Sequence, residues 1–258
     1  MIKETPIILT KSIKGKIGCT LPQLDVPEYK LDDFIDNNLI RKTKAELPEL
    51  SEPEIMRHFV NLSSKNHHID KDIFPLGSCT MKYNPKINES IASLELFSSV
   101  HPNQSDMFSQ PCLSILYDLE QMLKKMTGMS AFTLQPSAGS QGEFVGLLII
   151  KKYHEIKKNN KKIILIPESA HGTNPASVIL AGYKPVELGT DIRGRVDLED
   201  LKSKINNDVA GMMLTQPNTL GLFEDQISTI SELIHDVDGL MYMDGANLNA
   251  LIGLVKPA

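Results

Sequence analysis

Apolar residues follow two different patterns along the second half of the chain. Short, mostly apolar runs such as Ile163–Ile166 and Val209–Thr215 are bounded by polar or turn-forming residues. Such runs are typical of strands buried on both faces of a parallel sheet. Between them lie longer segments, such as Gly139–Lys158, in which apolar residues recur every three or four positions, as on a helix with one buried face. This alternation predicts an α/β domain with a mostly parallel sheet and helices on both faces.

Turn-forming residues divide this part of the chain into a regular series of elements. We expect helices at 111–127, 139–158, 175–181, 197–205 and 225–235, and strands at 131–135, 163–166, 184–188, 209–215 and 240–243. Gly128 and Gly182 stand just past two of the helices, where the left-handed backbone of glycine commonly ends a helix. We therefore place an α/β domain at residues 111–258.

Residues 1–110 have a weaker pattern and are expected to form an arm with helices. Four prolines in the first fifty residues indicate an extended arm with one short helix near Leu31–Ile40. Ser51–Glu54 reads Ser-Glu-Pro-Glu, a capping box that opens a further helix. Residues 74–85 are rich in turn formers and predict an ordered loop, and a helix is expected at 84–96.

Composition and charge narrow the class of partner. The 258 residues carry a formal net charge of -5 with both signs scattered, so no basic surface for nucleic acid is expected. No apolar run approaches the roughly 20 residues that span a bilayer, and the N-terminus does not read as a secretion signal, which favours a cytoplasmic protein without membrane contact. Cys19, Cys79 and Cys112 are too far apart for a disulfide framework or a metal site. We expect a small molecule or another protein as partner, and no metal.

Three loops fall at the carboxyl ends of predicted strands, where open α/β sheets bind their ligands. In the first, PSAGSQGE at 136–143, the backbone amides of Ala138, Gly139, Ser140 and Gln141 open a long helix and would hold a phosphate. The loop lacks the glycine spacing and the lysine of nucleotide-binding motifs, so a phosphate on a non-nucleotide ligand fits better. An ordinary glycine-rich turn is the alternative.

The other two loops each offer polar side chains. His171 lies in PESAHGTNP at 167–175, where its ring would face a flat ligand or transfer a proton; the alternative is a structural histidine with one hydrogen bond. TQPNTLGL at 215–222 offers Thr215 and Asn218, although turn formation alone would also explain Asn218.

Asp244 ends the last predicted strand, in the stretch GLMYMDGANLNALIG at 239–253. An aspartate before glycine often only caps a turn, which is the alternative here. Together with Asn247 and the three loops, however, Asp244 would complete a site with a phosphate cradle, an imidazole and an acid. Pyridoxal 5'-phosphate is a phosphate-bearing aromatic ring whose nitrogen an acid keeps protonated, so it is the expected cofactor.

Five stretches of the chain resemble signature sequences of a known enzyme family. They are FPLGSCTMKYNPKINE, LQPSAGSQGE, PESAHGTNPAS, LTQPNTLGLFE and DGANLNALIG. These strings resemble the pyridoxal-phosphate glycine decarboxylase, or P protein, of the glycine cleavage system, which implies an aminotransferase-like large domain of fold type I. The N-terminal GKIGCTLPQLDVP is similar to the start of the second subunit of the two-subunit bacterial form. The resemblance runs in order through essentially the whole chain.

The resemblance implies a role for each candidate residue around the ring of the cofactor. His171 would stack on the pyridine ring, and Asp244 would pair with the ring nitrogen. Asn247 is placed to reach the phenolic oxygen, and residues 138–141 would hold the phosphate.

Further residues are expected to line the same pocket or to approach the substrate. Thr215 and Asn218 would line the pocket, and Ser78, Cys79 and Thr80 would approach the substrate. The implied reaction removes the carboxylate of glycine as carbon dioxide and passes the aminomethyl group to the lipoyl arm of the carrier (H) protein. The implied assembly is a heterotetramer with glycine decarboxylase subunit 1.

One feature departs from the family pattern. The lysine that forms the Schiff base with the cofactor is expected on a later strand than Asp244, whereas this chain ends at Ala258 and Lys256 comes too early. We therefore expect an α/β domain that is incomplete at its C-terminus, with weak, non-covalent cofactor binding and no turnover. The alternatives are a non-catalytic structural partner of subunit 1 and, less favoured for lack of glycine motifs, a nucleotide-dependent α/β enzyme.

Overall fold

The computed structural model describes residues 4–72 and 83–258 of the chain. The chain forms two compact units, Met1–Pro75 and Leu76–Ala258. The division after residue 110, expected from the change in apolar pattern, remains a prediction. Most of the loop expected at 74–85 lies outside the described residues. Within the two described ranges, no helix combines the length and the apolar character that a membrane span requires.

Over residues 4–72, the first unit contains short elements and one regular helix. They are the 3-10 helices η1 (Ile8–Lys11) and η2 (Leu31–Asp33) and the helix α1 (Glu52–Ser63). The longer helix expected at 31–40 is wrong beyond Asp33. The side chain of Asp36 accepts a hydrogen bond from the backbone N–H of Asn38 at 3.0 Å, and such local turns compete with helical hydrogen bonding.

Helix α1 begins at the expected capping box. The carboxylate of Glu54 accepts hydrogen bonds from the backbone N–H (2.9 Å) and the hydroxyl (2.8 Å) of Ser51, and it pairs with the ammonium group of Lys16. The hydrogen bond from Lys16 and then those from Ser51 lower the pKa of Glu54 to about 2.

The substitution Lys16→Met is expected to raise the pKa of Glu54 towards its ordinary value of 4.5. The lysine is the main group that favours the charged carboxylate. Because the folded-state pKa lies below the unfolded one, the pairing stabilises α1 above about pH 4.5 and is lost as the pH falls towards 2. An NMR titration of the Glu54 carboxyl carbon measures the shift, with the exposed Lys14→Met as control. An unchanged pKa in Lys16→Met would contradict the assignment.

The second unit opens with three helices, α2 (Lys86–Ala92), α3 (Glu95–Ser98) and α4 (Asp106–Thr127). The expected start of α4 at Pro111 is wrong, because the helix begins at Asp106 and includes the proline. A proline removes one backbone donor, and the remaining turns of this 22-residue helix outweigh that loss. The end of α4 at Gly128, with a φ of 83°, is as predicted.

Four strands form one sheet in the order β2-β1-β3-β4. They are β1 (Ile163–Pro167), β2 (Lys184–Leu188), β3 (Val209–Thr215) and β4 (Leu240–Asp244). All three pairings are parallel, which confirms the prediction. The strand expected at 131–135 is wrong: over the ranges that the structure describes, no backbone hydrogen bond joins this segment to the sheet. A favourable local sequence does not form a strand without a partner.

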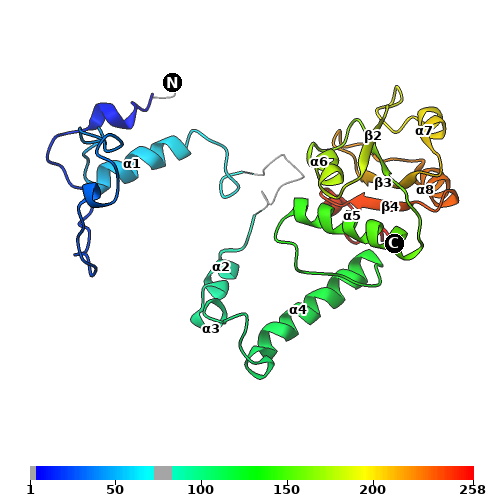
Figure 1. Cartoon of the computed structure of the whole chain (residues 1–258), viewed down its shortest axis with the longest axis horizontal. Helices are drawn as coiled ribbons and strands as arrows, with labels where there is room; N and C mark the ends of the chain where they lie inside the picture. Colours follow the sequence, from blue (N-terminus) through cyan, green and yellow to red (C-terminus); the bar gives the residue numbers. More distant parts are fainter. Residues whose placement is uncertain (1–3, 73–82) are drawn as a thin grey trace. The chain divides into compact units, whose positions relative to one another are not determined.

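Helices cover both faces of the sheet, as predicted, and Figure 1 shows α5 and α6 on one side and α7 and α8 on the other. Their bounds are Gly139–Ile156 (α5), Thr173–Leu180 (α6), Leu198–Lys204 (α7) and Ile227–Asp236 (α8). On one face Ile164 packs with residues of α5 and α6, and on the other its neighbour Leu165 packs with residues of α7 and α8. Both faces of the sheet therefore carry an apolar core, because successive strand residues point to opposite faces.

The strands β3 and β4 set the geometry that matters for the site. All seven residues of β3 are buried, and β4 lies at the edge of the sheet. The register pairs Gly211 with Leu240 at one end and Thr215 with Asp244 at the other. The two expected site residues Thr215 and Asp244 are therefore neighbours at the carboxyl end of the sheet.

Candidate functional site

Asp244 is held from two directions at the end of β4. One carboxylate oxygen accepts the backbone N–H of Ala246 at 3.0 Å, and the other accepts the side-chain amide of Asn174 at 3.3 Å. The first bond is the turn cap that the sequence offered as an alternative. The second comes from α6 and is not required by the turn. In the described part of the chain no cation pairs with this half-buried carboxylate, so the acid is available to a cationic group of a ligand.

Asn174 is a site residue that the sequence reasoning missed. Its side chain is only 1% exposed, and its amide oxygen has no hydrogen-bond partner among the described residues. The only sequence signal was its place in the loop that also carries His171. A buried polar atom without a partner is costly, and here it lies beside the acid of the candidate site.

The N-terminus of α5 offers open backbone amides. Ala138 precedes the helix in an extended conformation and provides no side-chain cap. The backbone N–H groups of Ala138, Gly139 and Ser140 have no acceptor in the described residues, whereas that of Gln141 donates to the carbonyl of Ala138 at 3.1 Å. The helix has 18 residues, so its dipole adds to these donors and favours an anion.

His171 is exposed, but one nitrogen of its ring is engaged. Its Nδ1 lies 2.7 Å from the hydroxyl of Thr173 and 3.2 Å from the backbone nitrogen of the same residue. In the described residues Nε2 has no hydrogen-bond partner. The imidazole is thus anchored at one edge and open at the other.

Glu143 is linked to His171 through Thr173 and was not identified as a separate candidate from the sequence. Its carboxylate, 6% exposed, accepts hydrogen bonds from the hydroxyls of Thr173 (2.8 Å) and Ser177 (3.0 Å).

Burial, with smaller contributions from the charges of Asp244 and Glu143, raises the pKa of Tyr242. The phenol therefore stays neutral in this part of the structure.

The two expected site residues at the end of β3 and in the loop after it differ in whether their polar atoms already have partners. Asn218 is used within the protein: its amide donates to the carbonyl of Gly194 at 3.0 Å, and its oxygen accepts the backbone N–H groups of Leu220 and Leu222. The hydroxyl of Thr215, by contrast, is buried and has no partner among the described residues. The geometry favours Thr215 over Asn218 as a ligand contact.

Asn247 follows the last strand and ties two loops together. Its side-chain amide donates to the carbonyl of Pro217 at 3.0 Å. This leaves its side-chain oxygen without a partner in the described part of the chain. Asn247 therefore positions the β3 loop beside the β4 loop and still offers an acceptor.

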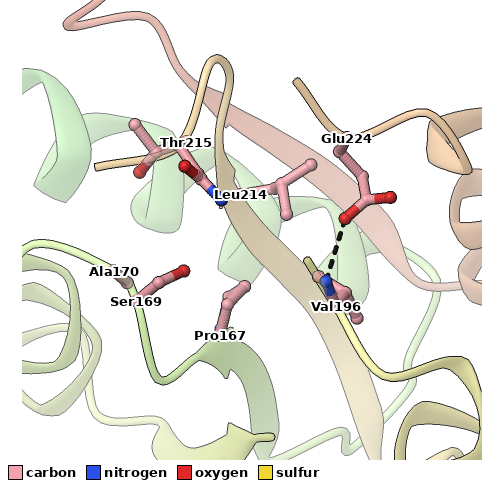
Figure 2. A pocket seen from close by; sticks show the side chains of 8 residues that line it. Pro167, Ser169, Ala170, Val196, Leu214, Thr215 and Glu224 are labelled. Atoms are coloured by element: carbon pink, nitrogen blue, oxygen red, sulfur yellow. Dashed lines mark hydrogen bonds between the residues drawn. The ribbon is translucent and has the colours of Figure 1, made fainter. Parts of the chain in front are cut away.

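A small pocket lies beside these residues (Figure 2). Figure 2 shows Ser169 and Thr215 on one side and Glu224 on the other, where its carboxylate accepts the backbone N–H of Val196 at 2.9 Å. The cavity of about 10 Å³ holds no more than about one water molecule. Two expected site residues, Thr215 and Asn218, line this cavity, which is too small to receive a cofactor.

Contacts connect three of the expected residues, His171, Asp244 and Thr215, into one site. Glu143 of α5 contacts Thr173, which contacts His171; Asn174, next along α6, contacts Asp244, which lies beside Thr215. The available groups are amide donors at a helix N-terminus, an unpaired carboxylate, an open ring edge and an orphaned hydroxyl. This set fits a flat ligand with an anionic group and a cationic ring. Ser78, Cys79 and Thr80 lie outside the described residues.

The chain matches a family of known proteins over most of its length. A sequence model of the family described as "Glycine cleavage system P-protein" matches residues 24–258. A relative from Chloroherpeton thalassium is 52% identical to this chain, over 98% of this chain and 51% of the relative. A relative from Listeria monocytogenes is 49% identical, over 99% of this chain and 53% of the relative. Both are named probable glycine dehydrogenase (decarboxylating) subunit 2. The chain thus spans about half the length of the curated relatives that it matches.

Solved structures share the fold. A crystal structure of glycine decarboxylase (P-protein) of the glycine cleavage system in inhibitor-bound form matches with a TM-score of 0.61 and 19% identity, over 83% of this chain and 48% of that one. Sphingosine-1-phosphate lyase from Burkholderia pseudomallei matches with a TM-score of 0.56 and 16% identity, over 84% and 54%. The aminotransferase-like, fold type I class expected from the sequence is confirmed. By its sequence, the chain belongs to the glycine cleavage system P-protein family.

Proposed function

We propose that this chain provides the pyridoxal-phosphate site of a glycine decarboxylase of the glycine cleavage system. The observation that carries the proposal is Asp244, an acid at the carboxyl end of a parallel strand that is oriented by Asn174 and has no cation partner in the described residues. In a family whose members are named glycine dehydrogenase (decarboxylating), this acid is suited to a ring nitrogen that must stay protonated.

The proposal gives each side chain of the site a task that its contacts support. Asp244 pairs with the ring nitrogen, and His171 lies against the ring. The open amides from Ala138 to Ser140 bind the phosphate, and the hydroxyl of Thr215 offers a further donor or acceptor. The bound cofactor supplies a ring that accepts electrons from the carbon that loses its carboxylate.

Two further residues support this arrangement. Asn247 offers its free oxygen to the ring substituents while it holds the carbonyl of Pro217. Asn218 holds the loop after β3 in shape through its hydrogen bonds to backbone groups, and it acts on the ligand only indirectly. The role in substrate binding of Ser78, Cys79 and Thr80 remains part of the proposal.

The relatives are about twice as long as this chain, so the activity of the whole protein is part of the proposal. The proposed reaction releases the carboxylate of glycine as carbon dioxide and transfers the aminomethyl group to a lipoyl carrier protein. The relatives are named subunit 2, and the proposed partner is accordingly glycine decarboxylase subunit 1. Lys256 lies next to Gly128 at the end of α4, and no lysine contacts the polar groups of Asp244 or His171 in the described residues. The binding tested with this chain is therefore non-covalent.

Binding of pyridoxal 5'-phosphate to this chain tests the proposal. Equilibrium dialysis is expected to detect it, and pyridoxal, which lacks the phosphate, is expected to bind roughly 10- to 100-fold more weakly because it cannot use the helix N-terminus. At 100 times the dissociation constant the cofactor would raise the free energy of unfolding by about 2.7 kcal/mol. Equal binding of the two ligands would contradict the phosphate site. Stabilisation by nucleotides alone would contradict the proposed cofactor.

A further inference from the structure

The hydrogen bonds of Glu143 join α5 to α6 and also lead, through Thr173, to His171. The carboxylate lies in the second turn of α5, is 6% exposed and has no cation partner among the described residues. Burying such a group is costly unless it is hydrogen-bonded. Both of its oxygens are bound by hydroxyls of α6, and one of these hydroxyls also contacts His171.

The hydroxyl of Thr173 lies between two groups that compete for its hydrogen. Its oxygen is 2.8 Å from Glu143 Oε1 and 2.7 Å from His171 Nδ1. A hydroxyl has one hydrogen to donate and lone pairs with which to accept. When Thr173 donates to the carboxylate, its oxygen is left to accept a hydrogen from Nδ1 of His171.

A second contact at the same ring nitrogen has the opposite requirement. The backbone N–H of Thr173 points towards His171 Nδ1 at 3.2 Å, which would need an unprotonated nitrogen. This distance is at the long limit for a hydrogen bond, whereas the 2.7 Å contact with the hydroxyl is short. A hydrogen bond to a charged carboxylate is also stronger than one between neutral groups. The shorter, charge-assisted chain of contacts therefore decides the proton position.

We propose that Glu143 is a positioning residue that acts through Thr173 to keep a proton on Nδ1 of His171 and to fix the plane of the ring. This inference rests on the proposed function, in which His171 stacks on the flat ring of the cofactor. An imidazole with a fixed plane suits that stacking. With Nδ1 engaged, Nε2 is the nitrogen that faces outward, and in the neutral ring it carries no hydrogen. The outer edge of His171 then accepts hydrogen bonds.

The position of the proton can be measured without any cofactor. Imidazole nitrogen–proton NMR correlations of the chain are expected to show His171 with its proton on Nδ1, and the loss of signals in His171→Phe assigns the residue among the seven histidines. In Thr173→Val only the backbone N–H remains at Nδ1, so the proton is expected to move to Nε2. Thr173→Ser keeps the hydroxyl and is expected to restore the original form.

Ser177→Ala is the matched control. It removes the other hydroxyl bound to Glu143 but leaves the contact between Thr173 and His171 in place, so the proton is expected to stay on Nδ1. Glu143→Ala frees the hydroxyl hydrogen of Thr173 for Nδ1, and the proton is expected to move to Nε2. A purely structural role of the cluster predicts no such difference between Glu143→Ala and Ser177→Ala.

Three outcomes would overturn the inference: a proton on Nε2 in the unchanged chain, the same form in Thr173→Val as in the unchanged chain, or the same form in Glu143→Ala as in Ser177→Ala. Dialysis with pyridoxal 5'-phosphate separates this result from the proposed function. Thr173→Val is expected to weaken cofactor binding about 2- to 10-fold, the effect of one ordinary hydrogen bond. If the NMR result is as expected and no cofactor binds, the proposed function fails and the positioning of His171 stands.

Discussion

Asp244→Asn is expected to weaken the binding of pyridoxal 5'-phosphate by about 10- to 100-fold. A hydrogen bond between charged groups contributes about 1.5–3 kcal/mol, and each 1.4 kcal/mol is about tenfold in affinity. The asparagine retains an oxygen for the backbone N–H of Ala246, so the turn keeps its cap. The new NH2 group faces the amide of Asn174, whose oxygen, unpartnered among the described residues, can accept from it when that amide turns over. The loss should therefore fall mainly on the ligand. Equilibrium dialysis measures it, alongside urea unfolding of both chains.

The same substitution at the opposite end of the sheet provides the control. Asp208 precedes β3 and is exposed, so Asp208→Asn removes one negative charge far from the strand end that carries Asp244. Its affinity for the cofactor is expected to remain unchanged. If Asp244→Asn binds as tightly as Asp208→Asn, Asp244 is only the cap of a turn and the proposed site loses its main support.

Gly211→Ala is expected to lower the free energy of unfolding by at least about 2 kcal/mol. A Cβ atom on this residue would lie 2.3 Å from the carbonyl oxygen of Leu240, which is backbone and cannot rotate away. Overpacking of an interior usually costs about 1–3 kcal/mol, and here the strain falls on the pairing of β3 with β4. The same pairing sets Thr215 beside Asp244, so cofactor binding is expected to fall as well. Urea unfolding followed by circular dichroism measures the stability.

Gly142→Ala is the matched control for this substitution. It adds the same methyl group in helix α5, where no atom other than the adjacent residues and the backbone of the helix itself lies within 4 Å of the new Cβ. Alanine is favoured over glycine inside a helix by about 0.5–1 kcal/mol, so this variant is expected to be slightly more stable. A stability of Gly211→Ala equal to that of the unchanged chain would show that β3 and β4 are not in the close register described.

The carboxyl end of the sheet shows how far the residues themselves predict a site. His171 and Asp244 were found because each follows a short apolar run, and parallel strands bring such positions to one end of the sheet. Glu143 and Asn174 were not found. Each lies inside a helix, where the sequence does not reveal whether a polar side chain faces solvent or another polar group.

Two of the wrong predictions have different causes. The segment 131–135 has the local character of a strand, but a strand depends on a partner that the local sequence does not supply. Helix α4 extends past Pro111 because the loss of one hydrogen bond is small against the whole helix. The missing strand partner decides the first case, and the length of the helix decides the second.

The sequence by itself determined the alternation of strands and helices, the parallel sheet and the positions of the polar loops. These features depend on periodic burial and on turn residues, which are local properties of the chain. Only the tertiary structure decided which polar atoms meet. It set Asn174 on Asp244, the hydroxyl of Thr173 between Glu143 and His171, and the orphaned hydroxyl of Thr215 beside the acid. Hydrogen bonds need separations of about 3 Å and a defined direction, and only the packing of α5 and α6 on the sheet provides both.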